Sequence, residues 1–294
     1  MSKLSSILTP EIRNKIKELE IQTRRLLRGS QAGDARSAQK GTGFEFDQIR
    51  EYQLGDDIRF IDWHASARMN TILVKQYIEE RSRSIIIALD ISASSNIGST
   101  ANFKRDTLAQ IASTLALVAT FGKDRAGLIL FSDEIEHYIP PSLGMQHTQK
   151  IMQESFIFQP RKKRTNLSIL FKKLASLKLR DMVCFIISDF IDSQLDAHYL
   201  RSVCNRYDVT GIRCLDTWEK DLPAIGFVPM IDQETGEFLY MDLRNKETAT
   251  TFLHERKLHQ DQFLKRNGMQ IIDVQNNHAF IGDLVKYFRR QMHY

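Results

Sequence analysis

The chain has 294 residues, 42% hydrophobic and 26% charged, a composition typical of soluble globular proteins with a sizeable core. Its 41 basic and 36 acidic residues leave a net charge of +5, too small an excess to indicate nucleic-acid binding by itself. No run of about 20 apolar residues occurs, so the sequence predicts no membrane span. The N-terminus lacks a signal-peptide pattern and the three cysteines include no CxxC pair. We therefore expect a cytoplasmic protein without a cysteine-bound zinc ion.

The first predicted element is a helix over residues 9–29. Thr9 is a suitable N-cap, and Pro10 suits the first helical position because the N–H that proline lacks would be unpaired there. Residues 29–43 are rich in glycine, serine and alanine and predict a loop. Residues 44–82 mix short strand-like runs with charged segments, so we expect a β-containing extension there.

From residue 84 onward, near-continuous apolar runs alternate with amphipathic segments. The apolar runs predict strands over residues 84–90, 127–131, 182–188 and 208–215. The amphipathic segments predict helices over residues 102–122, 168–179 and 194–207. Buried strands that alternate with helices are typical of a parallel sheet covered on both faces. The sequence therefore predicts a doubly wound, mostly parallel α/β fold of the Rossmann type.

The C-terminal part begins with a predicted β-hairpin near residues 225–243, which turns at Thr235-Gly236. The elements predicted after it are a helix, a strand and a last helix, over residues 247–267, 269–274 and 279–292. We expect two domains in all. Residues 1–82 would combine the N-terminal helix with a segment that docks on the core, and residues 83–294 would form the α/β domain with the hairpin as an insertion.

Oxygen-bearing side chains follow two of the predicted strands and precede one predicted helix. The first strand ends in Asp90, and Ser92 and Ser94 follow in the next turn. A later strand runs into Asp189, and Thr165 stands before a helix. Because ligands of open parallel sheets bind beyond the carboxyl ends of the strands, these oxygens are candidates for holding a hard divalent cation. Taken alone, the first motif could equally be a pair of helix-capping residues.

These residues resemble the metal-ion-dependent adhesion site of von Willebrand factor A domains, in the pattern Asp-Ile-Ser-Ala-Ser. The resemblance implies a von Willebrand factor A-like fold and a site for Mg²⁺, with Mn²⁺ and Ca²⁺ as alternatives. It also implies that an acidic residue of a protein partner completes the coordination. The residues implied as ligands are Asp90, Ser92, Ser94, Thr165 and Asp189, whereas Ser188 is expected to cap or support them.

A second resemblance lies upstream, in "GFEFDQIREYQLGDDIRFIDWHASARMNTILVKQYIEER" (43–81). This segment is similar to the signature of the domain-of-unknown-function family fifty-eight, and the resemblance spans roughly residues 10–215. Members carry the segment directly ahead of a von Willebrand factor A-like domain and are typically encoded beside MoxR-type AAA+ ATPases. The resemblance therefore implies such an ATPase as a partner. Some relatives carry transmembrane helices, which this chain lacks.

Two charged segments invite other interpretations. Asp56, Asp57 and Asp62 could be catalytic, but arginines interleave with them, and acids matched in this way are usually ion-paired. We therefore expect a charge-paired structural segment or a partner surface there. The basic run Arg161, Lys162, Lys163 and Arg164 could be a solvated loop, bind phosphate, or steer an acidic partner towards Thr165.

The leading hypothesis is a metal-dependent protein-interaction module, an adaptor that acts with a MoxR-type ATPase in assembling or remodelling a protein complex. The main alternative is a metal-dependent phosphoester hydrolase. Aspartyl-phosphate phosphatases carry a second acid two residues after the first, whereas this chain has Ser92. No complete catalytic motif was found, so we do not expect an enzyme. A nucleic-acid binder is a weaker alternative, because basic and aromatic residues do not interleave.

Overall fold

The computed structural model describes residues 10–31, 44–79, 82–93, 104–162, 164–190, 195–215, 227–231, 238–242 and 246–275. The chain divides into two compact units. Residues 1–30 and 83–294 form one, called here the α/β unit, and residues 31–82 form the other, called the hairpin unit. Within the described ranges, no helix combines the length and apolar character that a membrane crossing requires.

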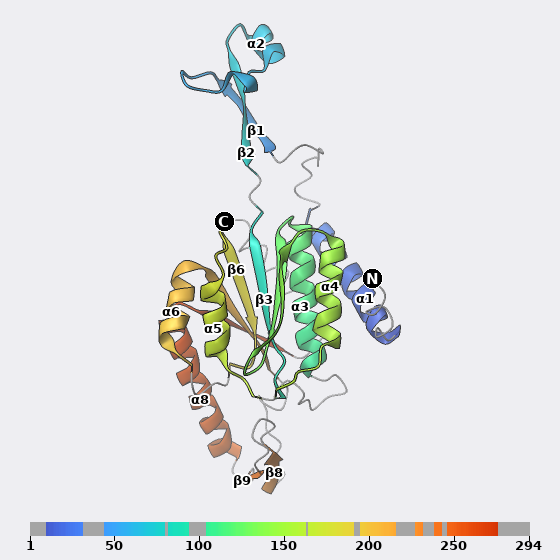
Figure 1. Ribbon diagram of the computed structural model, residues 1–294, viewed down its shortest axis with the longest axis vertical. Helices are drawn as coiled ribbons and strands as arrows, with labels where there is room; N and C mark the ends of the chain where they lie inside the picture. The colour runs from blue at the N-terminus through green and yellow to red at the C-terminus, as the bar shows by residue number, and fades with distance from the viewer. Residues whose placement is uncertain are drawn as a thin grey trace. The chain divides into compact units, whose positions relative to one another are not determined.

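A six-stranded sheet forms the centre of the α/β unit (Figure 1), in the spatial order β10-β7-β6-β3-β4-β5. Its strands are β3 (Ser84–Asp90), β4 (Arg125–Phe131), β5 (Ile135–Ser142), β6 (Met182–Ile187), β7 (Asp208–Leu215) and β10 (Gln270–Gln275). All neighbouring pairs are parallel except β4 and β5, which are antiparallel. The strand of this sheet that comes first in the sequence, β3, therefore lies between β4 and β6, and all seven of its residues are buried.

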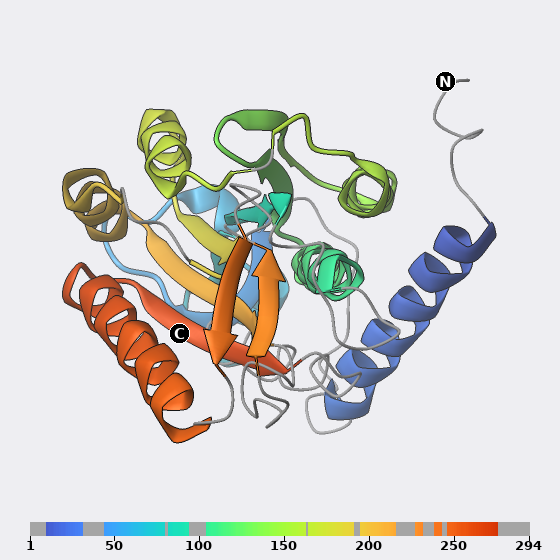
Figure 2. The same cartoon turned by 90° about the horizontal axis from the view of Figure 1, so that it is seen from below.

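Helices cover both faces of this sheet (Figures 1 and 2). One face carries α1 (Pro10–Gln31), α3 (Lys104–Phe121) and α4 (Met145–Ile157), and the other carries α5 (Leu167–Ser176), α6 (Ala197–Arg206) and α8 (Lys246–Arg266). The side chains of β3 alternate between the two layers, with Ile87 packed in the first and Ile86 in the second. The doubly wound, mostly parallel α/β fold predicted from the sequence is therefore confirmed.

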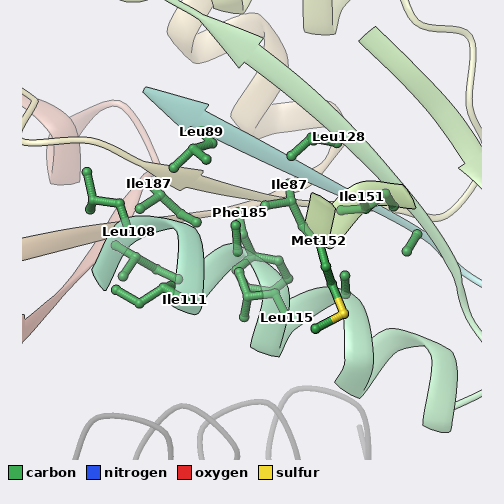
Figure 3. Packing of buried hydrophobic residues seen from close by; sticks show 14 of the residues in the cluster. Ile87, Leu89, Leu108, Ile111, Leu115, Leu128, Ile151, Met152, Phe185 and Ile187 are labelled. Atoms are coloured by element: carbon green, nitrogen blue, oxygen red, sulfur yellow. The ribbon is translucent and has the colours of Figure 1, made fainter. Parts of the chain in front are cut away.

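Figure 3 shows the larger of the two apolar layers, between α3 and the sheet. Leu108, Ile111 and Leu115 lie on the face of α3 that meets Ile87 of β3 and Phe185 of β6. Their spacing of three and four residues places them on one side of the helix. This layer holds the central strands against α3, and so fixes the place where β3 ends.

The N-terminal helix α1 packs with the α/β unit. Leu19 is only 4% exposed and belongs to the same apolar layer as α3. The Lys15 ammonium also pairs with the Asp106 carboxylate of α3 at 2.5 Å. The division therefore differs from the predicted one, which joined this helix to the following segment in residues 1–82.

The hairpin unit consists of an antiparallel pair, β1 (Phe44–Glu51) and β2 (Leu73–Glu79), joined by η1 (Ile58–Phe60) and α2 (Trp63–Met69). The three aspartates Asp56, Asp57 and Asp62 are all paired, as predicted. The bonds are Arg50 to both oxygens of Asp56 at 2.7 Å, Arg59 to Asp57 at 2.6 Å, and Lys75 to Asp62 at 3.2 Å. Asp62 also caps α2 by accepting hydrogen bonds from the N–H groups of His64 and Ala65. The docking of this segment on the α/β unit stays a prediction.

Most elements of the α/β unit match their predictions in type and place. The insertion hairpin is confirmed as β8 (Phe227–Ile231) paired antiparallel with β9 (Phe238–Asp242). Its predicted turn, the loop at 32–43 and the last helix at 279–292 lie outside the described residues. Two elements were not predicted, α4 and the edge strand β5, which contains Pro140 and Pro141.

Shortening a buried side chain in the apolar layer shown in Figure 3 tests how much this packing contributes to the stability of the fold. Leu115 is fully buried, so Leu115→Ala is expected to lower the free energy of unfolding by about 2–5 kcal/mol, through lost burial and the cavity left behind. Urea denaturation followed by circular dichroism measures this change. Lys150→Ala, on the exposed side of α4, is the control and is expected to stay within about 0.5 kcal/mol of the parent. Equal effects of the two substitutions on the free energy of unfolding would contradict the assignment of Leu115 to the buried core.

Candidate functional site

Asp90 stands at the carboxyl end of the central strand and is buried, with 3% of its surface exposed. The backbone continues in sheet-like fashion for one more residue, because Ile91 N–H donates to the carbonyl of Phe131. The chain then turns, and the N–H of Ser92 donates to Asp90 Oδ1 at 2.9 Å. The carboxylate therefore organises the turn that follows its own strand.

Two further segments reach the other oxygen of the same carboxylate. Ser188, directly after β6, donates from Oγ to Asp90 Oδ2 at 2.6 Å. Thr165, just before α5, lies with Oγ1 at 3.4 Å from the same oxygen. Because β3 and β6 are parallel neighbours, their carboxyl ends meet at one edge, and the loop before α5 joins them there. The predicted convergence of residues 90, 165 and 188–189 is therefore present.

The electrostatic setting of Asp90 opposes its ionisation. Burial raises the pKa of its carboxyl, and the nearby negative charge of Asp189 raises it further, to about 7. Hydrogen bonds from Ser188 and Ser92 act in the opposite direction, because they favour the charged form. Asp189 itself is half-buried. The two carboxylates thus lie close enough to repel each other, and a cation bound near both would relieve this repulsion.

The donor set fits a hard divalent cation. Asp90 and Asp189 supply carboxylates, and the hydroxyls of Ser92 and Thr165 supply neutral oxygens, which are ligand types that Mg²⁺ accepts. The described residues contain no group of three or more histidine, cysteine or acidic side chains that could hold a metal ion in another way. Ser94, the fifth predicted ligand, lies outside the described residues.

The turn that carries Asp189 is held by its neighbour Phe190, which the sequence analysis did not identify. Phe190 has a φ of 60° and is almost completely buried. A left-handed backbone costs a residue with a side chain about 1–2 kcal/mol. The N–H of Phe190 donates to Ser188 Oγ at 3.1 Å, and this is the hydroxyl that reaches Asp90. Ring burial and this bond offset the strain.

Gly211 in β7 makes room for this aromatic ring. A Cβ atom at position 211 would lie 2.7 Å from Cζ of Phe190 and 2.6 Å from Cε of Met269, both well inside van der Waals contact. The signal was present in the sequence, because a glycine inside an apolar strand often marks a close approach by another group. Which side chain approaches Gly211 could be found only from the fold.

Glu136 of β5 holds the loop that leads to Thr165, and it too was missed. Its Oε1 accepts hydrogen bonds from the backbone N–H groups of Arg161 and Lys162, at 3.0 and 3.1 Å, and from Ser132 Oγ at 2.9 Å. At the other end of the loop, Asn166 N–H donates to the carbonyl of Ser132. Both ends of the segment around Thr165 are thus fixed to the β4–β5 turn.

The predicted basic run lies at the surface beside this loop. The side chains of Arg161, Lys162 and Arg164 are exposed, whereas Lys163 lies outside the described residues. Their backbone is tied down through Glu136, but their charged ends reach solvent. The run therefore places positive charge next to Thr165 in the chain.

The fold and this edge of polar groups define the class of the protein, a doubly wound α/β protein with polar groups gathered at the carboxyl ends of its strands and with an added hairpin unit. The family described as "Protein of unknown function DUF58" matches residues 48–262, and the chain belongs to this family. Its relatives include the uncharacterized proteins Rv1480 of Mycobacterium tuberculosis and Mb1516 of Mycobacterium bovis. Each is 26% identical over 285 residues, which cover 95% of this chain and 89% of the relative.

Solved structures with a similar arrangement include BatB from Bacteroides thetaiotaomicron, with 14% identity and a TM-score of 0.49 over 72% of this chain and all of that one. A von Willebrand factor type A protein from Catenulispora acidiphila has 7% identity and a TM-score of 0.45, covering 75% of this chain and 44% of that one.

The raised pKa of Asp90 predicts a pH-dependent stability in ion-free protein. Because the folded-state pKa of about 7 lies above the ordinary value of 3.8, folded protein retains a proton that the unfolded chain releases. This contribution is complete below about pH 4 and is lost as the pH rises through about 7, a change of up to about 4 kcal/mol. The measurement is the difference in unfolding free energy between parent and Asp90→Asn, in chelator, across this pH range. A difference that does not vary with pH would contradict the prediction.

The role of Glu136 can be tested by proteolysis, since the loop it holds contains four consecutive trypsin sites. Glu136→Ala removes the acceptor for the Arg161 and Lys162 N–H groups, so cleavage in residues 161–164 is expected to become about tenfold faster. Glu134→Ala, which removes an exposed carboxylate two residues away, is the matched control. Cleavage at equal rates in the two variants would show that Glu136 does not hold the loop.

Proposed function

We propose that this protein is a metal-dependent protein-interaction module whose ion site is formed by Asp90, Asp189, Ser92, Thr165 and Ser94. The observation that carries the proposal is the buried Asp90 carboxylate, which meets hydroxyls from two other segments and the charge of Asp189. Ser188 supports the set by holding Asp90 and the turn at Phe190. Mg²⁺ is the proposed ion, with Mn²⁺ and Ca²⁺ as alternatives.

The chemistry of the donors favours binding over catalysis. Two carboxylates and several neutral hydroxyls balance the charge of a divalent ion without surplus, so the bound ion would retain affinity for a further carboxylate. An aspartate or glutamate of a partner protein is the proposed occupant of that position. The exposed side chains of Arg161, Lys162 and Arg164, together with Lys163, would draw this acidic partner towards the site.

The partner that we propose is a MoxR-type AAA+ ATPase, with which the protein would act in the cytoplasm as an adaptor for assembling or remodelling a protein complex. This part of the proposal is supported by the similarity of residues 43–81 to the family signature. It is separate from ion binding and has its own test, so that one part can fail without the other.

Ion binding is tested by isothermal titration of Mg²⁺ into the parent protein and Asp90→Asn. Loss of the buried carboxylate charge is expected to weaken binding roughly 100-fold or more, because even indirect partners of a metal contribute 10- to 100-fold. Asp208→Asn is the control, since Asp208 is a carboxylate at the opposite ends of the strands, far along β7 from the site. Equal affinity of parent and Asp90→Asn, or no binding by the parent, would refute the ion site.

The partner is tested with a purified MoxR-type ATPase from the same organism. Parent protein is expected to retain the ATPase on a column in Mg²⁺ and to release it in chelator, whereas Asp90→Asn is expected not to retain it. Retention that is equal in Mg²⁺ and chelator would rule out the ion as the link. Turnover of a phosphoester by the parent, but not by Asp90→Asn, would instead favour a hydrolase.

A further inference from the structure

The hairpin unit exposes an unusual amount of apolar surface between its two strands. Residues 52–72, called here the cap, connect β1 to β2 and include η1 and α2. Leu54 is fully exposed, Trp63 is 67% exposed and Met69 is 70% exposed. The large apolar side chains that the cap presents to solvent are Leu54, Ile58, Phe60, Trp63, Met69 and Ile72. In the rest of the described chain, exposed large apolar side chains are not concentrated in one segment in this way.

Little of this unit is covered by its own residues. Val74 is the only large apolar side chain that is buried among the hairpin-unit residues whose side chains are described. An isolated two-stranded hairpin is marginally stable in water, and burying apolar side chains is what stabilises small folds. The cap therefore gains stability from a surface that covers it.

The charges of the cap limit which kind of partner surface can cover it. Residues 52–72 contain three aspartates and two arginines, and the aspartates are already paired with Arg50, Arg59 and Lys75. A nearly neutral, internally paired surface gives no electrostatic attraction to nucleic acid or to anionic lipid. For the same reason, two such surfaces can meet without like-charge repulsion.

The exposed area is also sufficient for self-association. If a fully exposed large side chain presents about 200 Å², the six apolar side chains of the cap together expose roughly 800 Å². This is about what each partner contributes to a standard protein–protein interface. Tryptophan, methionine and phenylalanine are moreover the residue types that interface centres favour.

We propose that the cap is the contact surface of a homodimer, in which two copies of the chain meet cap to cap about a twofold axis. In such an interface the same patch serves both copies, so an apolar patch without net charge is self-complementary. The dimer is independent of the ion site, because it rests on different residues in a different unit.

The test is sedimentation velocity of the full chain from about 1 to about 100 µM, the range in which a modest interface dissociates. The parent is expected to shift from monomer to dimer across this range. Each of two variants is expected to raise the dissociation constant at least tenfold. The double variant Trp63→Ser with Met69→Ser removes the apolar centre of the interface. The single variant Ile58→Arg places like charges on both sides of the twofold axis. Leu143→Ser, which changes a leucine of the α/β unit that is 51% exposed, is the control.

Circular dichroism and Mg²⁺ titration of each variant check that folding and the ion site are intact. A parent that stays monomeric throughout would overturn the proposal and assign cover of the cap to another surface. A dimer that persists unchanged in both cap variants would overturn it as well. Asp90→Asn is expected to dimerise like the parent, so the dimerisation result can be interpreted even if the ion-site proposal fails.

Discussion

Burial of the Asp90 carboxylate is the constraint on which the arrangement of the site depends. The sheet places this acid at the end of its central strand, under apolar layers on both sides, where an unshared negative charge is costly. The surrounding hydroxyls and the N–H of Ser92 compensate part of that cost, while Asp189 adds to it. The net effect is the raised pKa of the Asp90 carboxyl. A divalent cation would favour the ionised form, which is why we propose that the cluster is a binding site.

The three segments that meet at Asp90 are held by different means. The turn after β3 is bound to the carboxylate itself, and the turn after β6 is held by a strained, buried Phe190 that fits over Gly211. The loop with Thr165 is bound to the β4–β5 turn through Glu136 and Ser132. In the second and third of these segments, the positions of the donors are therefore set by residues that are not donors. Pre-positioned oxygens lose less conformational freedom when an ion binds, and this favours affinity.

Sequence reasoning found the residues whose positions follow from the topology. Asp90, Thr165 and Asp189 could be predicted because strand ends of a parallel sheet meet at one edge, whatever the details of packing. Glu136 and Phe190 could not, since each acts through contacts with residues distant in the chain. The strand β5 was missed because Pro140 and Pro141 interrupt its pattern, and α4 because its apolar positions are few and interspersed with glutamines. The place of α1 depended on Leu19 and Lys15, whose partners lie in α3.

The two consecutive prolines of β5 also have a consequence for how molecules of this protein meet. A strand at the border of a sheet usually presents free backbone groups on which a foreign strand can add, and such addition leads to fibres. Pro140 and Pro141 lack the N–H that this addition needs, and charged residues such as Glu136 share the strand. Growth of the sheet past β5 is therefore disfavoured.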